Sequence, residues 1–196
     1  MPRASMRSAK TVLREVYGFP GFRAGQEEAV KAAVAGRDTV VLLPTGRGKS
    51  LCYQVPALTY RRAGRGPALV VSPLIALIDD QVDALRGRGV EAAALHSNLE
   101  AAEQRETIRA FVSGELDMLF VSPERAAQAR FRTQLTKAEV SLIAIDEAHC
   151  VSQWGHDFRP DYLRLHELRT VVNAPVVALT ATATPRVLDE VVERLE

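Results

Sequence analysis

The segment Pro44-Thr45-Gly46-Arg47-Gly48-Lys49-Ser50 carries the residue types that bind nucleotide phosphates. Glycines let backbone N–H groups of such a loop approach phosphate oxygens, and a following helix adds the positive end of its dipole. Lys49 can reach the outer phosphates, and the Ser50 hydroxyl is a suitable Mg²⁺ ligand. The sequence therefore predicts a site for ATP and Mg²⁺ in this segment.

The pattern for such loops has a glycine at the position of Leu43, so the match is partial. Gly46 and Gly48 still permit close approach of the backbone to a phosphate. The alternative is a surface turn that contains Gly-x-Gly-Lys-Ser by chance. An apolar run before the loop and a helical stretch after it favour the phosphate loop.

Two carboxylates, Asp146 and Glu147, directly follow the apolar run 140–145. Asp146 would hold Mg²⁺, usually through water, and Glu147 would orient or deprotonate the water that attacks the γ-phosphate. An acidic helix N-cap is the alternative, and it is common. The presence of a phosphate loop in the same chain favours the metal site.

The segment from Gln153 to Pro160 concentrates aromatic and basic side chains, including Trp154, Phe158 and Arg159. Aromatic faces beside a guanidinium suit base stacking and phosphate contact on a single nucleic-acid strand. The alternative is that Trp154 and Phe158 are core residues, as most large aromatic residues are. An irregular polar loop favours the binding interpretation.

Six apolar runs of strand length alternate with helical stretches, which predicts an α/β fold with an open parallel sheet and helices on both faces. An N-terminal helix and a connecting segment occupy residues 1–24. The expected strands are residues 39–43, 68–72, 91–95, 117–122, 140–146 and 175–180, and the expected helices include residues 25–35, 49–62, 73–88, 98–113, 161–172 and 185–195.

Three strand-to-helix junctions, Ser72-Pro73, Ser122-Pro123 and Thr184-Pro185, place a hydroxyl before a proline. This pattern predicts that each hydroxyl caps the following helix. Ligands of open parallel sheets bind outside the carboxyl ends of the strands, where these junctions lie. Thr180 ends the last expected strand and Thr182 follows it, and their turn can relay a change at the γ-phosphate.

The chain has 196 residues, 47% of them hydrophobic and 25% charged, which is typical of one globular domain. No apolar run approaches the roughly 18 residues that span a bilayer, so we expect a cytoplasmic protein. Two cysteines are too few for a disulfide framework. Because the net charge is only +1, any contact with nucleic acid must depend on local groups.

These motifs closely resemble the RecQ family of DNA helicases, within the superfamily 2 motors, from about Val16 to the last helix. The Gln153–Pro160 string is the most specific to that family. The matching motifs are Phe19-x-x-Phe22-Arg23-Ala24-Gly25-Gln26, Pro44-Thr45-Gly46-Arg47-Gly48-Lys49-Ser50, Val71-Ser72-Pro73-Leu74-Ile75-Ala76-Leu77, Ser122-Pro123-Glu124-Arg125, Asp146-Glu147-Ala148-His149-Cys150 and Ser152-Gln153-Trp154-Gly155-His156-Asp157-Phe158-Arg159-Pro160.

The resemblance implies a RecA-like P-loop NTPase domain and a role for each motif. Gln26 would read the adenine edge, Phe19 would stack on the adenine ring, and Arg23 would lie nearby. The residues implied in contacting DNA or coupling it to hydrolysis are Ser72, Pro73, Ser122, Arg125, His149, Gln153, Trp154, His156, Phe158, Arg159, Thr180 and Thr182. Three positions depart from the family pattern: Arg47 replaces a glycine, Ala24 a proline and Asp79 a lysine.

By this resemblance, residues 1–196 are the first of two RecA-like halves of a 3′-to-5′ helicase that unwinds DNA in recombination and repair. The second half would supply an arginine finger, so we expect the chain alone to bind ATP weakly, hydrolyse it poorly and not unwind DNA. In a bacterium it would be associated with the nucleoid. The alternatives are a nucleotide-dependent single-strand-binding module without catalysis and an RNA motor of the DEAH type.

Overall fold

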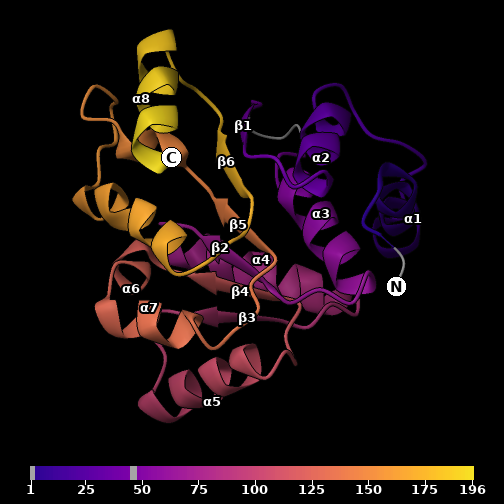
Figure 1. The fold of residues 1–196 in the computed structure, drawn as a ribbon, viewed down its shortest axis with the longest axis horizontal. Helices are drawn as coiled ribbons and strands as arrows, with labels where there is room; N and C mark the ends of the chain where they lie inside the picture. The colour runs from indigo at the N-terminus through magenta and orange to yellow at the C-terminus, as the bar shows by residue number, and fades with distance from the viewer. Residues whose placement is uncertain (1–2, 45–47) are drawn as a thin grey trace.

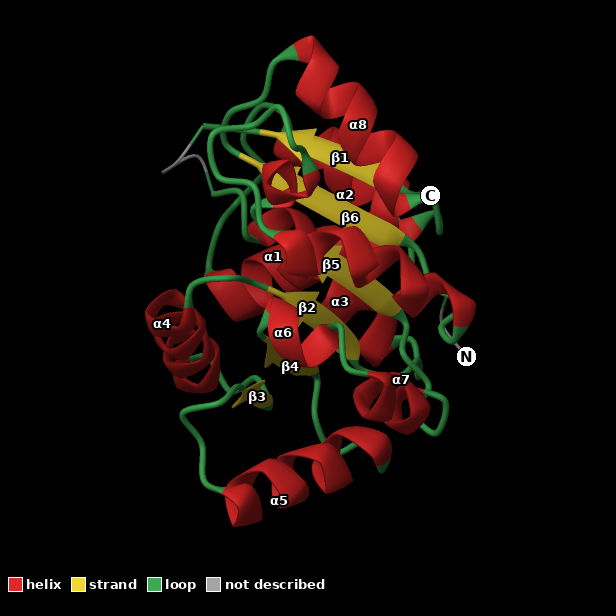
Figure 2. Cartoon of the chain, turned by 90° about the vertical axis from the view of Figure 1, so that its left-hand side faces the viewer, coloured by secondary structure: helices red, strands yellow, loops and turns green. Residues whose placement is uncertain are grey.

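The computed structural model describes residues 3–44 and 48–196. Its centre is a six-stranded sheet in the order β1-β6-β5-β2-β4-β3, with every neighbouring pair parallel (Figure 2). Each strand lies within a range that the sequence predicts. The strands are β1 Thr39–Leu42, β2 Ala68–Val71, β3 Ala92–Leu95, β4 Met118–Val121, β5 Leu142–Ile145 and β6 Val176–Thr180.

Helices connect the strands in the expected places. Helix α6 follows the predicted cap at Ser122, whereas the short helices α7 and η1 were not predicted. The segment expected as a helix at residues 161–172 is the 3₁₀ helix η2, in which Tyr162, Leu165 and Leu168 are buried; this three-residue spacing fits three residues per turn. The helices are α1 Met6–Tyr17, α2 Gln26–Val34, α3 Leu51–Arg62, α4 Ile75–Gly87, α5 Ala101–Val112, α6 Pro123–Ala126, α7 Ala129–Leu135, η1 Ala148–Val151, η2 Pro160–Thr170 and α8 Pro185–Leu195.

The helices cover both faces of the sheet, which confirms the predicted architecture. Alternate strand residues point to opposite faces, so Val70 joins one apolar cluster and Leu69 the other. The first cluster contains residues of α1 to α4, and the second contains residues of α5 to α8, η1 and η2. Figure 1 shows α1, α2 and α3 on one side of the strands and α6, α7 and α8 on the other.

Helix α3, which follows the phosphate loop, is buried on all sides from Cys52 to Tyr60. Two tyrosines fix it to its neighbours: Tyr60 donates a hydrogen bond to the Ala33 carbonyl at 2.6 Å, and Tyr17 donates to Gln54 Oε1 at 2.9 Å. The amino terminus of α3 therefore has a fixed position at the carboxyl ends of the strands.

Two of the three predicted helix caps are confirmed. Ser122 Oγ accepts from Arg125 N at the start of α6, and Thr184 Oγ1 accepts from Val187 N at the start of α8, both at 3.3 Å. The predicted cap at Ser72 is wrong. The chain bends at Pro73 and is extended at Leu74, the N-cap residue, so α4 begins at Ile75, beyond the reach of the Ser72 hydroxyl. None of the described helices combines the length and apolar character that crossing a membrane requires.

Candidate nucleotide site and aromatic loop

A cleft of about 670 Å³ lies at the carboxyl ends of β1 and β5. It brings together residues that are distant in sequence: the segment before α2, the end of the phosphate loop, and the acidic pair after β5. Its lining residues are Phe19, Pro20, Gly21, Arg23, Gln26, Gly48, Lys49, Ser50, Leu51, Leu77, Asp146 and Glu147.

Gln26 joins the predicted adenine segment to the phosphate loop. Its side chain is 1% exposed, its Oε1 accepts from Arg23 N at 2.8 Å, and its Nε2 donates to the Gly48 carbonyl at 2.9 Å. Gly48 has φ +70°, and a Cβ there would lie 2.3 Å from Gln26 Nε2. Only glycine fits this position without displacing the glutamine.

The acidic pair stands on an unusual backbone turn. Glu147 has φ 52° and ψ 43°, and among the described residues it is the only non-glycine residue with positive φ. Asp146 Oδ1 accepts from Glu147 N at 2.9 Å, and the Asp146 carbonyl accepts from the Tyr162 hydroxyl at 2.8 Å. These contacts hold a conformation that costs about 1–2 kcal/mol in a non-glycine residue.

Burial raises the pKa of Asp146, Lys49 opposes the shift, and the Glu147 carboxylate adds to it. The carboxylate is therefore only partly compensated by groups of this chain. Asp146 and the Ser50 hydroxyl line the same cleft and offer oxygen ligands, the kind that Mg²⁺ prefers. The donor set thus fits a magnesium ion.

His149 connects the acidic pair to the turn after β6. The Thr180 hydroxyl donates to the Thr182 carbonyl at 3.0 Å, so its single hydrogen is committed and it accepts from His149 Nδ1 at 2.8 Å. His149 Nδ1 also lies 3.5 Å from Glu147 Oε2. Burial lowers the pKa of His149, which favours the neutral ring.

One further group of possible metal ligands lies beside His149. The ligand atoms of His149, Cys150 and Asp157 are within 4.8 Å of one another. Burial raises the pKa of the Cys150 thiol to about 12, which keeps it protonated, and this thiol donates to Asp157 Oδ2 at 3.7 Å. These contacts account for the cluster without a cation.

The aromatic loop, residues 153–160, lies on the surface at the same sheet edge. Trp154 is 65% exposed and Phe158 is partly exposed, so neither is a core residue. The His156 ring stacks on His149 with 5.3 Å between centroids, and Arg159 Nε lies 3.7 Å from Asp157 Oδ1. The core interpretation of the two aromatic residues is therefore wrong.

Several other predicted residues in the described part of the chain do not line the cleft. Ser72 and Ser122 are buried at the ends of β2 and β4, and Pro73 is partly buried. Arg125 Nη1 donates to Gln104 Oε1 at 2.9 Å, and burial lowers the pKa of this arginine. Leu43 packs against the core and Pro44 is exposed, whereas Thr45, Gly46 and Arg47 lie outside the described residues.

Several residues of this region were not expected from the sequence. Leu77 on α4 lines the cleft and is 47% exposed. In the sequence it looks the same as any leucine on the surface of a helix. Arg186 and Glu190 on α8 contact the aromatic loop. Asp79 has a structural contact: its carboxylate lies 3.1 Å from Nε2 of the buried His96.

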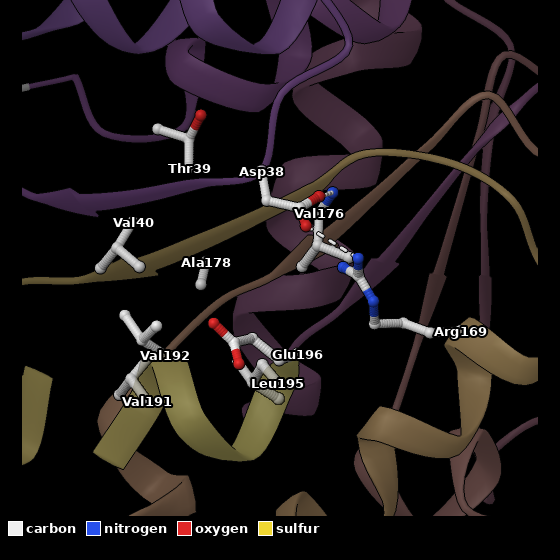
Figure 3. A pocket seen from close by; sticks show the side chains of 10 residues that line it. All are labelled: Asp38, Thr39, Val40, Arg169, Val176, Ala178, Val191, Val192, Leu195 and Glu196. Carbon is white, nitrogen blue, oxygen red and sulfur yellow. Dashed lines mark hydrogen bonds and ion pairs between the residues drawn. The ribbon is translucent and has the colours of Figure 1, made fainter. Parts of the chain in front are cut away.

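A second cleft, of about 260 Å³, opens at the amino ends of β1 and β6, on the edge opposite the nucleotide cleft (Figure 3). Asp38 accepts there from Arg169 Nη2 at 2.7 Å and from Val176 N at 2.9 Å. Burial by itself would raise the pKa of the Asp38 carboxyl. The two hydrogen bonds and the charge of Arg169 outweigh burial, so the pKa lies below its ordinary value. The rest of the lining is mainly apolar.

The model of the DEAD/DEAH box helicase family matches residues 23–191. The chain belongs to this family. Among curated relatives, an "ATP-dependent DNA helicase RecQ" from Haemophilus influenzae is 48% identical over 177 residues, and an "ATP-dependent DNA helicase Q5" from Rattus norvegicus is 47% identical over 194 residues. These matches cover 90% and 94% of this chain but only 28% and 20% of the relatives.

Solved structures of other helicases share the fold. The DUF1998 helicase MrfA bound to DNA has a TM-score of 0.75 at 21% identity, covering 100% of this chain and 29% of that one. The helicase domain of Pyrococcus furiosus Hef has a TM-score of 0.71 at 21% identity, covering 93% of this chain and 37% of that one. At this level of identity the likeness concerns the fold alone.

Proposed function

We propose that this chain is the ATP-binding half of the motor of a RecQ-like DNA helicase, with residues 1–196 as its first RecA-like domain. One observation carries the proposal: a single cleft holds Lys49 and Ser50 from the phosphate loop together with Asp146 and Glu147 from the end of β5. The names of the similar proteins, which are ATP-dependent DNA helicases, agree with it.

In the proposed reaction, Lys49 binds the outer phosphates of ATP, and Ser50 and Asp146 hold Mg²⁺. The metal, when bound, neutralises charge on the phosphates. Glu147 orients the attacking water and accepts a proton from it as the oxygen–γ-phosphorus bond forms and the bond to the bridging oxygen breaks. The turn that holds Glu147 fixes its carboxylate beside the phosphate loop.

The adenine is proposed to bind where Phe19, Arg23 and Gln26 line the cleft. Phe19 is 41% exposed, so its ring is available for stacking on a purine. Gln26 also contacts Gly48, so this side chain links the proposed adenine segment to the phosphate loop.

Single-stranded DNA is proposed to run along the carboxyl edge of the sheet, over the aromatic loop and the turns at Ser72-Pro73 and Ser122 to Arg125. In the whole protein, a second RecA-like half would close over the nucleotide and supply an arginine finger. Translocation with 3′-to-5′ polarity and duplex unwinding in recombination and repair belong to that whole protein.

Nucleotide binding tests the proposal directly. Titration calorimetry with ATP and Mg²⁺ is expected to show weak binding by the wild-type chain and at least about tenfold weaker binding by Lys49→Ala. Lys31→Ala, which removes an exposed lysine of α2, is the charge-matched control and should bind like the wild type. Equal affinities of the Lys49→Ala and wild-type chains, with unchanged circular dichroism, would exclude the phosphate-loop assignment.

Hydrolysis requires a second measurement with the separately produced second half. ATPase activity is expected only in the mixture, because an arginine finger contributes about 10³–10⁵ in rate in related phosphoryl-transfer enzymes. ATP binding without any hydrolysis in the mixture would favour a nucleotide-dependent binding module. Stronger stimulation by single-stranded RNA than by DNA would favour an RNA motor.

A further inference from the structure

Helix α8 carries a row of charged side chains that faces the aromatic loop. Arg186, Glu190 and Arg194 are spaced four residues apart and therefore share one face of the helix. Val187, Val191 and Leu195 form the adjacent face and are buried in the core. The charged row thus has a fixed position relative to the sheet.

Glu190 holds the start of the loop. Its side chain is only 12% exposed, and its Oε2 accepts from the Ser152 hydroxyl at 2.5 Å. Its Oε1 accepts from Gln153 N at 3.4 Å, and Ser152 Oγ in turn accepts from Trp154 N at 3.1 Å. One carboxylate therefore orders three consecutive residues that lead into the aromatic loop.

Arg186 contacts the ring of Trp154 itself. The central guanidinium carbon lies 3.7 Å from the ring centroid, which is a close cation–π stack. The indole is nevertheless 65% exposed. The arginine therefore lies over one face of the ring, while most of the side-chain surface remains exposed.

Helix α8 is also joined to the nucleotide cleft. It begins directly after the turn in which Thr180 accepts from His149, and His149 Nδ1 lies 3.5 Å from Glu147 Oε2. His149 thus links Glu147 in the cleft to the turn that precedes α8.

We infer that Arg186 and Glu190 are positioning residues for a stacking site on single-stranded DNA, in which Trp154 lies between the Arg186 guanidinium and a nucleobase. Glu190 sets the course of the loop, and Arg186 sets the plane of the ring and leaves one face for the base. This inference rests on the proposed function, because it names how one part of the proposed DNA path is built.

Trp154 is the only tryptophan of the chain, so its fluorescence reports this site alone. Acrylamide quenching should be stronger in Arg186→Ala than in the wild type, because the covered ring face becomes accessible. Glu190→Gln should also increase quenching, because the loop loses a charged acceptor. The matched controls are Arg37→Ala, at the opposite sheet edge, and Glu193→Gln, an exposed position of α8; both should behave like the wild type.

Binding of a fluorescein-labelled oligothymidine strand is measured on the same proteins by anisotropy, with tryptophan quenching as the second signal. Arg186→Ala should bind about three- to fivefold more weakly than Arg37→Ala, and Arg186→Lys should recover only part of the loss. Arg186 is exposed, so its loss should leave the circular dichroism unchanged.

The outcomes separate this inference from the proposed function. Suppose the wild type binds the strand with tryptophan quenching, but Arg186→Ala and Glu190→Gln equal their controls in both measurements. This result would overturn the positioning role and leave the proposed function standing. A wild-type chain that binds no strand would overturn both the DNA path and the stacking site, while the ATP titrations judge the nucleotide site separately.

Discussion

The side-chain amide of Gln26 donates a hydrogen bond to the backbone carbonyl of Gly48 at 2.9 Å. This contact joins the start of α2 to the loop that precedes α3, across 22 residues of sequence. Because Gln26 is 1% exposed, its amide has little freedom to choose another orientation. The shape of the phosphate loop therefore depends on a residue outside the loop.

Gly48→Ala should impair the nucleotide site. The added Cβ would lie 2.3 Å from Gln26 Nε2 at a φ of +70°, so both the loop and Gln26 must move. ATP affinity in calorimetry should fall by about tenfold or more. Gly36→Ala is the matched control, since Gly36 has φ +80° with nothing within 4 Å of its Cβ position.

The control should cost about 1 kcal/mol of stability through its left-handed backbone and leave ATP affinity unchanged. If Gly48→Ala and Gly36→Ala bound ATP equally well, the contact between Gln26 and Gly48 would have no role in shaping the site.

Asp146→Asn should stabilise the chain at neutral pH while impairing Mg²⁺ binding. Because burial raises the pKa of Asp146, the folded chain binds this proton more tightly than the unfolded chain. As the pH rises from the pKa of Asp146 in the unfolded chain, about 3.9, to its higher pKa in the folded chain, the free energy of unfolding therefore falls. This loss of stability persists at pH 7. Asparagine carries no such penalty.

Thermal unfolding measured at pH 7 checks this prediction. Without metal, Tm should be higher for Asp146→Asn than for the wild type, and millimolar Mg²⁺ should raise Tm of the wild type but not of Asp146→Asn. Asp83→Asn, at an exposed position of α4, should change neither value. A lower Tm for Asp146→Asn in the absence of metal would contradict the assignment of burial as the cause of the shift.

His149 should make the chain less stable in mildly acidic solution. Burial lowers the pKa of His149, so the unfolded chain takes up a proton that the folded chain resists. As pH falls below about 6.5, this difference lowers the free energy of unfolding. Urea titrations between pH 7.5 and 5 should show a smaller loss of stability for His149→Gln than for the wild type.

His166→Gln, at an exposed position of η2, should keep the wild-type pH dependence. If His149→Gln lost as much stability at low pH as the wild type, groups other than His149 would cause the acid sensitivity.

The sheet could be predicted because most of its strands are short and buried on both faces. Strand β2 is Ala68–Val71 and every residue in it is buried, which leaves a continuous apolar run in the sequence. Because proline is common in the first turn of a helix, the start of α8 at Pro185 could also be predicted. At Ser72-Pro73 the same pattern failed, because propensity alone does not reveal that Leu74 is extended and that α4 begins only at Ile75.

The candidate site was predictable where the chemistry lies in contiguous residues, as in Lys49-Ser50 and Asp146-Glu147. Contacts between distant segments were not. The sequence marks Gln26 and Gly48 separately but not the bond between them, and Arg186 and Glu190 look like ordinary charges on a surface helix. Such pairings depend on the three-dimensional arrangement of the elements, which the pattern of a single segment does not contain.

Strand β1 has one further consequence, for the behaviour of the isolated chain in solution. Within the described part of the protein it pairs with β6 only, so its other edge carries free backbone donors and acceptors. Val40 is 37% and Leu42 is 45% exposed beside this edge. Two copies could add strand to strand there, and concentrated samples would then self-associate without any change at the nucleotide cleft.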